Sequence, residues 1–399
     1  MDSDHAAGHL HDGHFGLSTV NLTFITTGGS PNGGSELLWS LAAIRLAKAG
    51  HRVAATAQYG EEPAPRLAEM RKLGIHLRMR RGPGIWSRFL RNLLRQRIEG
   101  FLPGKDWAWL LRQKSDLVCL SLGCVRDGRG WMLRCRAANV PYVVVSHLTS
   151  PGMWPEDETR EERAAAFSSA QRCFFVSRHN WELFEHQTGE VLTNASVVRN
   201  PFKVRYNAQA QWPSADLGWR LACVGTLDPA TKGQDLLIRV MAMQKWKERN
   251  LSVNCYGSGP CERGLRKLTD ALHLRSVCFK GYVEDIEQIW RENHGLIMPS
   301  WVEGLPIALV EAMLCHRMAL VTDVGGNTEL VEHGVNGFVA PAPTVALLDA
   351  AMEEAWQRRD EWRELGLEAR KKVVACVPPD PVQDFCGKLL ETAAGHKQE

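Results

Sequence analysis

Short apolar segments alternate with amphipathic segments along most of the chain. In the first half, apolar runs predict strands at residues 20–25, 52–57, 117–120, 142–146, 172–176 and 195–198. Residues 36–49, between the first two runs, have helical spacing. In the second half, the alternation restarts at 221–225 and continues through 251–256, 277–280, 295–298 and 318–322. This alternation is typical of parallel sheets flanked by helices, so the sequence predicts an α/β fold.

A polar, proline-containing stretch at 200–217 separates the two halves and is predicted to be a linker. We therefore expect Rossmann-like domains at 17–205 and 206–375. A disordered His-rich tail is expected at 1–16, and a final helix within 376–399 is expected to cross back to the N-terminal domain. Ligands of such folds bind at the carboxyl ends of the strands, so a cleft between the two facing sheets is the predicted site.

Composition narrows the functional classes. The net charge of +3 on 399 residues is too small to indicate nucleic-acid binding. The 11 cysteines form no C-x-x-C pair, which favours reduced thiols and a cytoplasmic location. No apolar run approaches the roughly 20 residues that a membrane-spanning helix needs. Histidines in the tail are interpreted as part of a disordered segment, so no metal site is predicted.

Residues 299–311 carry two carboxylates eight positions apart, Glu303 in a Gly/Pro turn and Glu311 inside the helix expected next. Pro306 suits the first helical position, and the free N–H groups of such a helix form a site for phosphate. A diphosphate there would have a carboxylate on each side, which suits a nucleotide-sugar. The alternative is a solvated loop glutamate and an ordinary helix glutamate.

A second glycine-rich segment, residues 27–36, follows the first predicted strand and opens a helix. Gly33 and Gly34 would let the backbone approach a phosphate or sugar, although a plain turn explains them equally well. The segment does not fit the dinucleotide-binding or P-loop spacing, so those two classes lose support.

Together these segments resemble the retaining GT-B glycosyltransferases of family four, the glycosyl transferases group 1. The resemblance implies a GT-B fold, with the acceptor on the N-terminal domain and a nucleotide-sugar on the C-terminal domain. It implies transfer of a sugar, from a UDP-sugar as the commonest donor, to a hydroxyl of a glycan, lipid or small molecule. It also implies that no metal or cofactor is needed and that the leaving phosphate accepts the proton of the acceptor. Glu303 would contact the donor sugar and Glu311 the ribose, with Gly304, Leu305 and Pro306 in the donor site.

Two further segments extend the resemblance. Residues 224–233 look like the basic diphosphate site of the family, in which Lys232 supplies a positive charge. Thr226 stands where the family usually has arginine, which leaves donor type and catalytic strength open. His147 follows the strand predicted at 142–146 and is either structural or, as the resemblance implies, in contact with the donor sugar. Replacing Lys232 by alanine is expected to lower turnover far more than folding stability.

Residues 86–98 combine helical apolar spacing with several arginines. Such a segment is interpreted either as a surface helix packed on the core or as a peripheral contact with the inner membrane face. Two alternative functions also stay open. One is a catalytically weak sugar-nucleotide or glycan-binding protein, and the other is a different GT-B enzyme such as a nucleotide-sugar epimerase.

Overall fold

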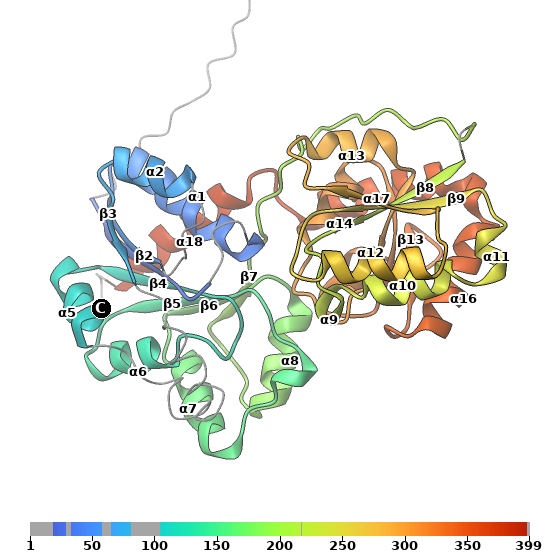
Figure 1. Cartoon of the computed structure of the whole chain (residues 1–399). Helices are drawn as coiled ribbons and strands as arrows, with labels where there is room; N and C mark the ends of the chain where they lie inside the picture. Colours follow the sequence, from blue (N-terminus) through green and yellow to red (C-terminus); the bar gives the residue numbers. More distant parts are fainter. Residues whose placement is uncertain (1–18, 29–32, 58–64, 81–103, 217, 397–399) are drawn as a thin grey trace, which may run out of the picture.

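The computed structural model describes residues 19–28, 33–57, 65–80, 104–216 and 218–396, which form two lobes, each built on a parallel sheet (Figure 1). The His-rich tail at 1–16 and the basic segment at 86–98 lie outside the described residues, so both expectations remain untested. Within the part of the chain that is described, no helix is long and apolar enough to cross a membrane.

The first lobe contains a seven-stranded parallel sheet in the order β3-β2-β1-β4-β5-β6-β7. Its strands are β1 (Asn21–Thr26), β2 (Arg52–Ala57), β3 (His76–Met79), β4 (Leu117–Leu122), β5 (Tyr142–Ser146), β6 (Arg172–Phe175) and β7 (Ala195–Val197). Its helices are α1 (Gly34–Lys48), α2 (Pro65–Lys72), α5 (Gly104–Gln113), α6 (Arg129–Ala137), η1 (Pro151–Met153), α7 (Asp157–Ser168) and α8 (Arg178–Thr188). Strands β4 and β5 are buried along their whole length, because helices cover both faces.

The second lobe contains a six-stranded parallel sheet in the order β10-β9-β8-β11-β12-β13. Its strands are β8 (Trp219–Val224), β9 (Leu251–Tyr256), β10 (Val277–Gly281), β11 (Gly295–Met298), β12 (Met318–Thr322) and β13 (Gly337–Ala340). The helices that follow the linker are α9 (Pro229–Lys232), α10 (Gln234–Met241), α11 (Gln244–Lys247), α12 (Glu262–Ala271), α13 (Ile286–Glu292), α14 (Ile307–Leu314), α15 (Asn327–Leu330), α16 (Val345–Gln357), η2 (Arg359–Glu361), α17 (Trp362–Cys376) and α18 (Pro381–His396).

The strands predicted from apolar runs are present, and two parallel sheets with flanking helices confirm the α/β prediction. Strand β3 was not predicted, because it is a sheet edge whose residues are only partly buried and form no apolar run. Residues 200–216 contain no helix or strand. The domain boundaries at 205 and 375 stay predictions.

The last helix, α18, packs in the first lobe although it follows the second lobe in sequence. Figure 1 shows it in red beside the blue helix α1. Phe385 is fully buried and meets the Phe174 ring edge-on at 5.6 Å between centroids. At the start of the helix, Asp380 accepts a 2.6 Å hydrogen bond from Arg45 of α1. These contacts tie the end of the chain to the first sheet.

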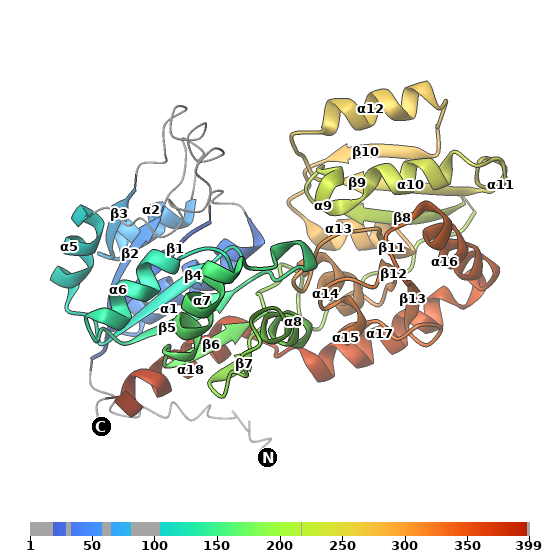
Figure 2. The same ribbon diagram turned by 90° about the horizontal axis from the view of Figure 1, so that it is seen from below.

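The two lobes, seen from below in Figure 2, touch where the strands of both sheets end. A Cβ on Gly304 would lie 2.1 Å from the carbonyl oxygen of His147, and one on Gly34 would lie 3.0 Å from the Ile307 side chain. A Cβ on Gly326 would likewise lie 2.7 Å from the Cβ atom of Ser177, the residue that caps α8. The two lobes therefore approach each other closely at these three glycines, where a larger residue would collide with the opposite lobe.

Candidate active site

The site predicted by sheet topology lies between β8 and β11. Chain connections leave these neighbouring strands in opposite directions along the sheet, which is the point where α/β sheets bind ligands. The loop after β8 leads into Lys232, and the loop after β11 contains Glu303. Sheet order thus brings together two residues that are 71 positions apart in sequence.

Lys232 and Glu303 form an ion pair at the centre of this site. The Lys232 Nζ atom donates to Glu303 Oε1 at 2.7 Å, and Ser300 Oγ donates to the same oxygen at 2.7 Å. The Glu303 side chain is 6% exposed and the Lys232 side chain 27%. A buried carboxylate needs such partners because it has lost its water. The contacts of Lys232 and Ser300 with Oε1 therefore hold the Glu303 carboxylate in one position.

Gly233 explains why the two loops approach so closely. Its φ of +64° is a left-handed conformation, and a Cβ there would lie 2.0 Å from the carbonyl oxygen of Pro299. Only glycine fits both the conformation and the space. Gly233 ends α9 at Lys232, so the same residue orients the lysine and lets the β11 loop pass beside it.

The helix after Glu303, α14, begins at Ile307, with Pro306 in the extended conformation of an N-cap residue. The proline thus lies one position earlier than predicted. Leu305 is buried at 5% exposure and anchors the turn. The first residues of α14 face Gly34, which together with Gly33 begins α1 in the other lobe. Two helix N-termini, each with free N–H groups and partial positive charge, therefore meet at the interface.

Glu311 lies inside α14 and is 4% exposed. Its Oε1 atom accepts a 2.8 Å hydrogen bond from the backbone N–H of Lys203 in the linker. Burial raises the pKa of Glu311 to about 7, although the Lys203 N–H and its positive charge oppose the shift. A carboxyl group with this pKa exchanges its proton near neutral pH and can accept or donate a hydrogen bond to a hydroxyl.

His147 follows β5 and is 7% exposed. Burial lowers the pKa of His147 to about 4, with the nearby Asn200 side chain opposing the shift, so the ring is neutral at pH 7. Its Nε2 atom lies 3.4 Å from Ser121 Oγ, while Nδ1 has no hydrogen-bond partner in the described part of the chain. The ring is therefore held at the carboxyl edge of the first sheet with one nitrogen unused.

Thr226, where the resembled family usually has arginine, is exposed in the loop after β8. Its carbonyl oxygen accepts a 2.8 Å hydrogen bond from Gln234. Thr226 adds no positive charge to the site. Among the residues predicted to bind the diphosphate, the cation is Lys232, which is paired with Glu303. The roles predicted for these residues remain predictions.

Sequence reasoning missed three groups that hold the predicted residues in place. Ser300 bonds Glu303, the Lys203 backbone bonds Glu311, and Asn200 lies by His147. A Ser-x-x-Glu spacing, as in a capping box, was the available signal for Ser300. The other two contacts involve the linker, and nothing in its local sequence indicates them.

Comparison with known proteins identifies the second lobe. Residues 218–358 match the family model described as glycosyl transferases group 1. Residues 218–358 form a group 1 glycosyltransferase domain. EpsD of Bacillus subtilis, named as a glycosyltransferase, is 30% identical over 141 residues, which are 35% of this chain and 37% of that protein. A glycosyltransferase named MJ1607 from Methanocaldococcus jannaschii is 26% identical over 267 residues, 58% of this chain and 67% of that one. These matches span about one to two thirds of the relatives.

Solved structures extend the similarity to both lobes. HepE of Anabaena in complex with UDP-glucose has a TM-score of 0.69 at 17% identity, covering 94% of this chain and 100% of that one. Sucrose-phosphate synthase from Thermosynechococcus elongatus has a TM-score of 0.70 at 19% identity, with the same coverage. The two lobes together therefore have the GT-B fold. The predicted resemblance to the group 1 glycosyltransferases is also confirmed.

Proposed function

We propose that the chain transfers a sugar from a UDP-sugar to a hydroxyl acceptor with retention of anomeric configuration. The observation that carries the proposal is the Lys232–Glu303 pair at the β8/β11 edge, placed beside the N-terminus of α14. The similarity to HepE, whose structure contains UDP-glucose, supports a UDP-sugar as donor. A glycan, lipid or small molecule presents the acceptor hydroxyl on the side of the first lobe.

In this proposal, the acceptor oxygen forms a bond to the anomeric carbon as the bond from that carbon to the diphosphate oxygen breaks. The acceptor proton passes to the leaving phosphate oxygen on the same face, and UDP is released. Lys232 and the N-terminus of α14 stabilise the growing negative charge, because both are already oriented before reaction. Glu303 binds the sugar hydroxyls, Glu311 the ribose, and the neutral His147 ring borders the sugar.

The test is product analysis with a panel of UDP-sugars and hydroxyl acceptors. Proton NMR of the first product should show the donor's own anomeric configuration, and turnover should be unchanged by a metal chelator. An inverted product would refute retention. Product formed equally without an acceptor would instead favour an epimerase or hydrolase.

Exposed Thr226 favours one alternative, a sugar-nucleotide or glycan-binding protein with weak catalysis. Arginine can bind a phosphate through two parallel hydrogen bonds, and threonine cannot. If the missing cation limits catalysis, Thr226→Arg should raise turnover at least tenfold with little change in donor affinity. Donor binding without transfer in both the natural chain and this variant would support the binding protein.

A further inference from the structure

A basic cavity lies at the edge of the first sheet that points away from the second lobe. It has a volume of 330 Å³ and is lined by the starts of β1, β2 and β3 and by the end of α5. A strand rises about 3.3 Å per residue, so this edge lies about 17 Å from the carboxyl ends of the strands. The cavity is therefore separate from the candidate active site.

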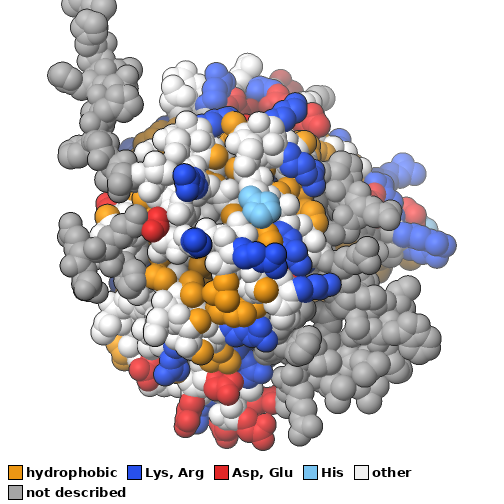
Figure 3. All heavy atoms as spheres, turned by 90° about the vertical axis from the view of Figure 1, so that its left-hand side faces the viewer, with side chains coloured by type: hydrophobic (Ala, Val, Ile, Leu, Met, Phe, Trp, Pro, Cys, Tyr) orange, Lys and Arg blue, Asp and Glu red, His pale blue; other side chains and the backbone are white. Residues whose placement is uncertain are grey.

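Four basic side chains line the cavity, Arg52, His76, Arg112 and Lys114, and none of its lining residues is Asp or Glu. Among the described residues, the side chains of Arg52 and Lys114 have no hydrogen-bond or ion-pair partner. Figure 3, which faces this edge, shows Lys and Arg side chains gathered around a histidine. Like charges in one cavity repel each other, and a bound anion would relieve that repulsion.

Polar groups complete the lining. The hydroxyl groups of Thr23 and Ser115 form a hydrogen bond of 2.6 Å, and Gln113 Oε1 lies 2.8 Å from His76 Nδ1. Because an amide oxygen can only accept, that histidine nitrogen donates. Hydroxyl, imidazole and guanidinium groups within one small cavity are the donors that phosphate oxygens bind.

Lys114 holds a conformation that lysine disfavours. It follows the last residue of α5 with a φ of +49°, the left-handed region in which glycine normally ends a helix. Attraction to the negative end of α5 explains a cation at Arg112 or Lys114. It does not explain Arg52 and His76, which come from two strands.

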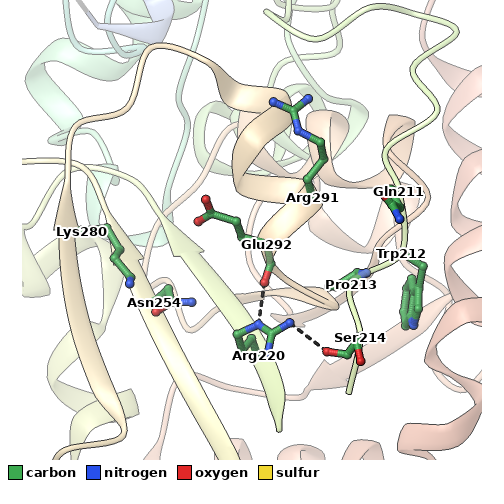
Figure 4. Close-up of a pocket in the computed structure, with 9 residues that line it drawn as sticks. All are labelled: Gln211, Trp212, Pro213, Ser214, Arg220, Asn254, Lys280, Arg291 and Glu292. Atoms are coloured by element: carbon green, nitrogen blue, oxygen red, sulfur yellow. Dashed lines mark hydrogen bonds between the residues drawn. The ribbon is translucent and has the colours of Figure 1, made fainter. Parts of the chain in front are cut away.

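A larger cavity in the second lobe shows the contrast. This 550 Å³ cavity, shown in Figure 4, also contains basic residues, but two of them are held by protein groups and an acidic residue is part of the lining. Arg220 donates to the backbone oxygens of Glu292 and Ser214, and Arg291 pairs with Asp285 at 2.6 Å. The side chain of Glu292 also lines it. Of these two cavities, only the one in the first lobe has several basic lining residues and no acidic one.

We propose that the cavity at Arg52, His76, Arg112 and Lys114 binds a phosphate group, carried by a soluble phosphorylated molecule or by an anionic phospholipid headgroup. The inference goes beyond the transfer reaction and does not depend on it. Its location places such a ligand on the face of the first lobe opposite the donor site.

The test compares the natural chain with two double variants of equal charge. Arg52→Ser with Lys114→Gly removes two cavity cations and relieves the strained φ, so it should fold at least as well. Arg71→Ser with Lys72→Ser removes two exposed cations of α2 outside the cavity. Inorganic pyrophosphate is titrated calorimetrically with UDP present in excess, and co-sedimentation compares phosphatidylglycerol with phosphatidylcholine vesicles.

We expect the cavity variant to bind pyrophosphate, phosphatidylglycerol vesicles or both at least tenfold more weakly, while the α2 variant binds as the natural chain does. Loss for pyrophosphate alone assigns a soluble phosphate ligand, and loss for vesicles alone assigns a lipid headgroup. Equal binding by all three proteins, or no binding by the natural chain, overturns the proposal. The proposal is judged by the difference in binding between the cavity variant and the α2 variant. That difference has the same meaning if UDP does not bind, that is, if the proposed transfer function is wrong.

Discussion

Replacing Lys232 by alanine separates the catalytic use of the ion pair from its structural use. The change removes the cation 2.7 Å from Glu303 and leaves a carboxylate of 6% exposure with the Ser300 hydroxyl as its side-chain partner among the described residues. Loss of a preorganised charge at a growing oxyanion costs about 3–4 kcal/mol of barrier, or a factor of roughly 10² to 10³ in turnover. We expect that loss in a UDP-release assay with a saturating UDP-sugar.

The same change should also destabilise the fold. Removing one partner of a buried ion pair costs about 3–5 kcal/mol, which urea unfolding will measure. The sequence alone predicts little loss of stability, because it does not reveal the contact with Glu303. Combining Lys232→Ala with Glu303→Gln should recover most of the stability and none of the turnover, since it removes the buried charge as well.

Lys245 provides a matched control. It also pairs with two carboxylates, at 2.8 Å to Asp349 and 3.0 Å to Glu353, but these residues lie outside the candidate site. Lys245→Ala should therefore change stability without changing the turnover of the folded fraction. The reasoning would be refuted if Lys232→Ala kept turnover within twofold of the natural chain, or if Lys245→Ala lost as much.

Three further predictions concern the other site residues. Glu311, with its pKa raised to about 7 from 4.5, binds more protons in the folded chain between these values, so stability falls as pH rises through them. Glu311→Gln should remove that fall, about 3 kcal/mol in urea unfolding at pH 4.5 and 8, and a pH-independent difference would contradict it. The pKa of His147 is lowered to about 4, so the unfolded chain binds more protons between pH 4 and 6.5, and the free energy of unfolding falls as pH falls through this range. His147→Gln should abolish this part of the acid destabilisation. An unchanged dependence of the unfolding free energy on pH below 6.5 would contradict the prediction. Gly304→Ala places a methyl group 2.1 Å from the His147 carbonyl oxygen and should lower kcat/KM for the donor at least tenfold, whereas Gly387→Ala, with open space around it, should not; equal values would show that the lobes tolerate separation.

The strands and the fold class could be predicted because burial on both faces leaves continuous apolar runs, as at 142–146. Strand β3 could not, because an edge strand is buried only in part and its His76–Met79 segment has no such run. The apolar pattern placed Lys232 and Glu303 each in a segment that follows a predicted strand. It could not place them together, because their contact depends on the order of strands in the sheet.

The linker contacts were the least predictable part of the site. Lys203 bonds Glu311 through its backbone, so its side chain gives no signal in the sequence. Asn200 approaches His147 because they follow β7 and β5, whose carboxyl ends lie at the same edge of the first sheet. Such contacts depend on tertiary packing, and local propensity does not encode them.

The central claim is that a nucleotide-sugar binds between the lobes through Lys232 and the two carboxylates. A crystal structure of the chain with UDP-glucose tests it most directly. The account predicts the diphosphate at Lys232 and the N-terminus of α14, sugar hydroxyls on Glu303, and ribose hydroxyls on Glu311. A nucleotide-sugar seen elsewhere, or with both carboxylates turned away from it, would contradict the account.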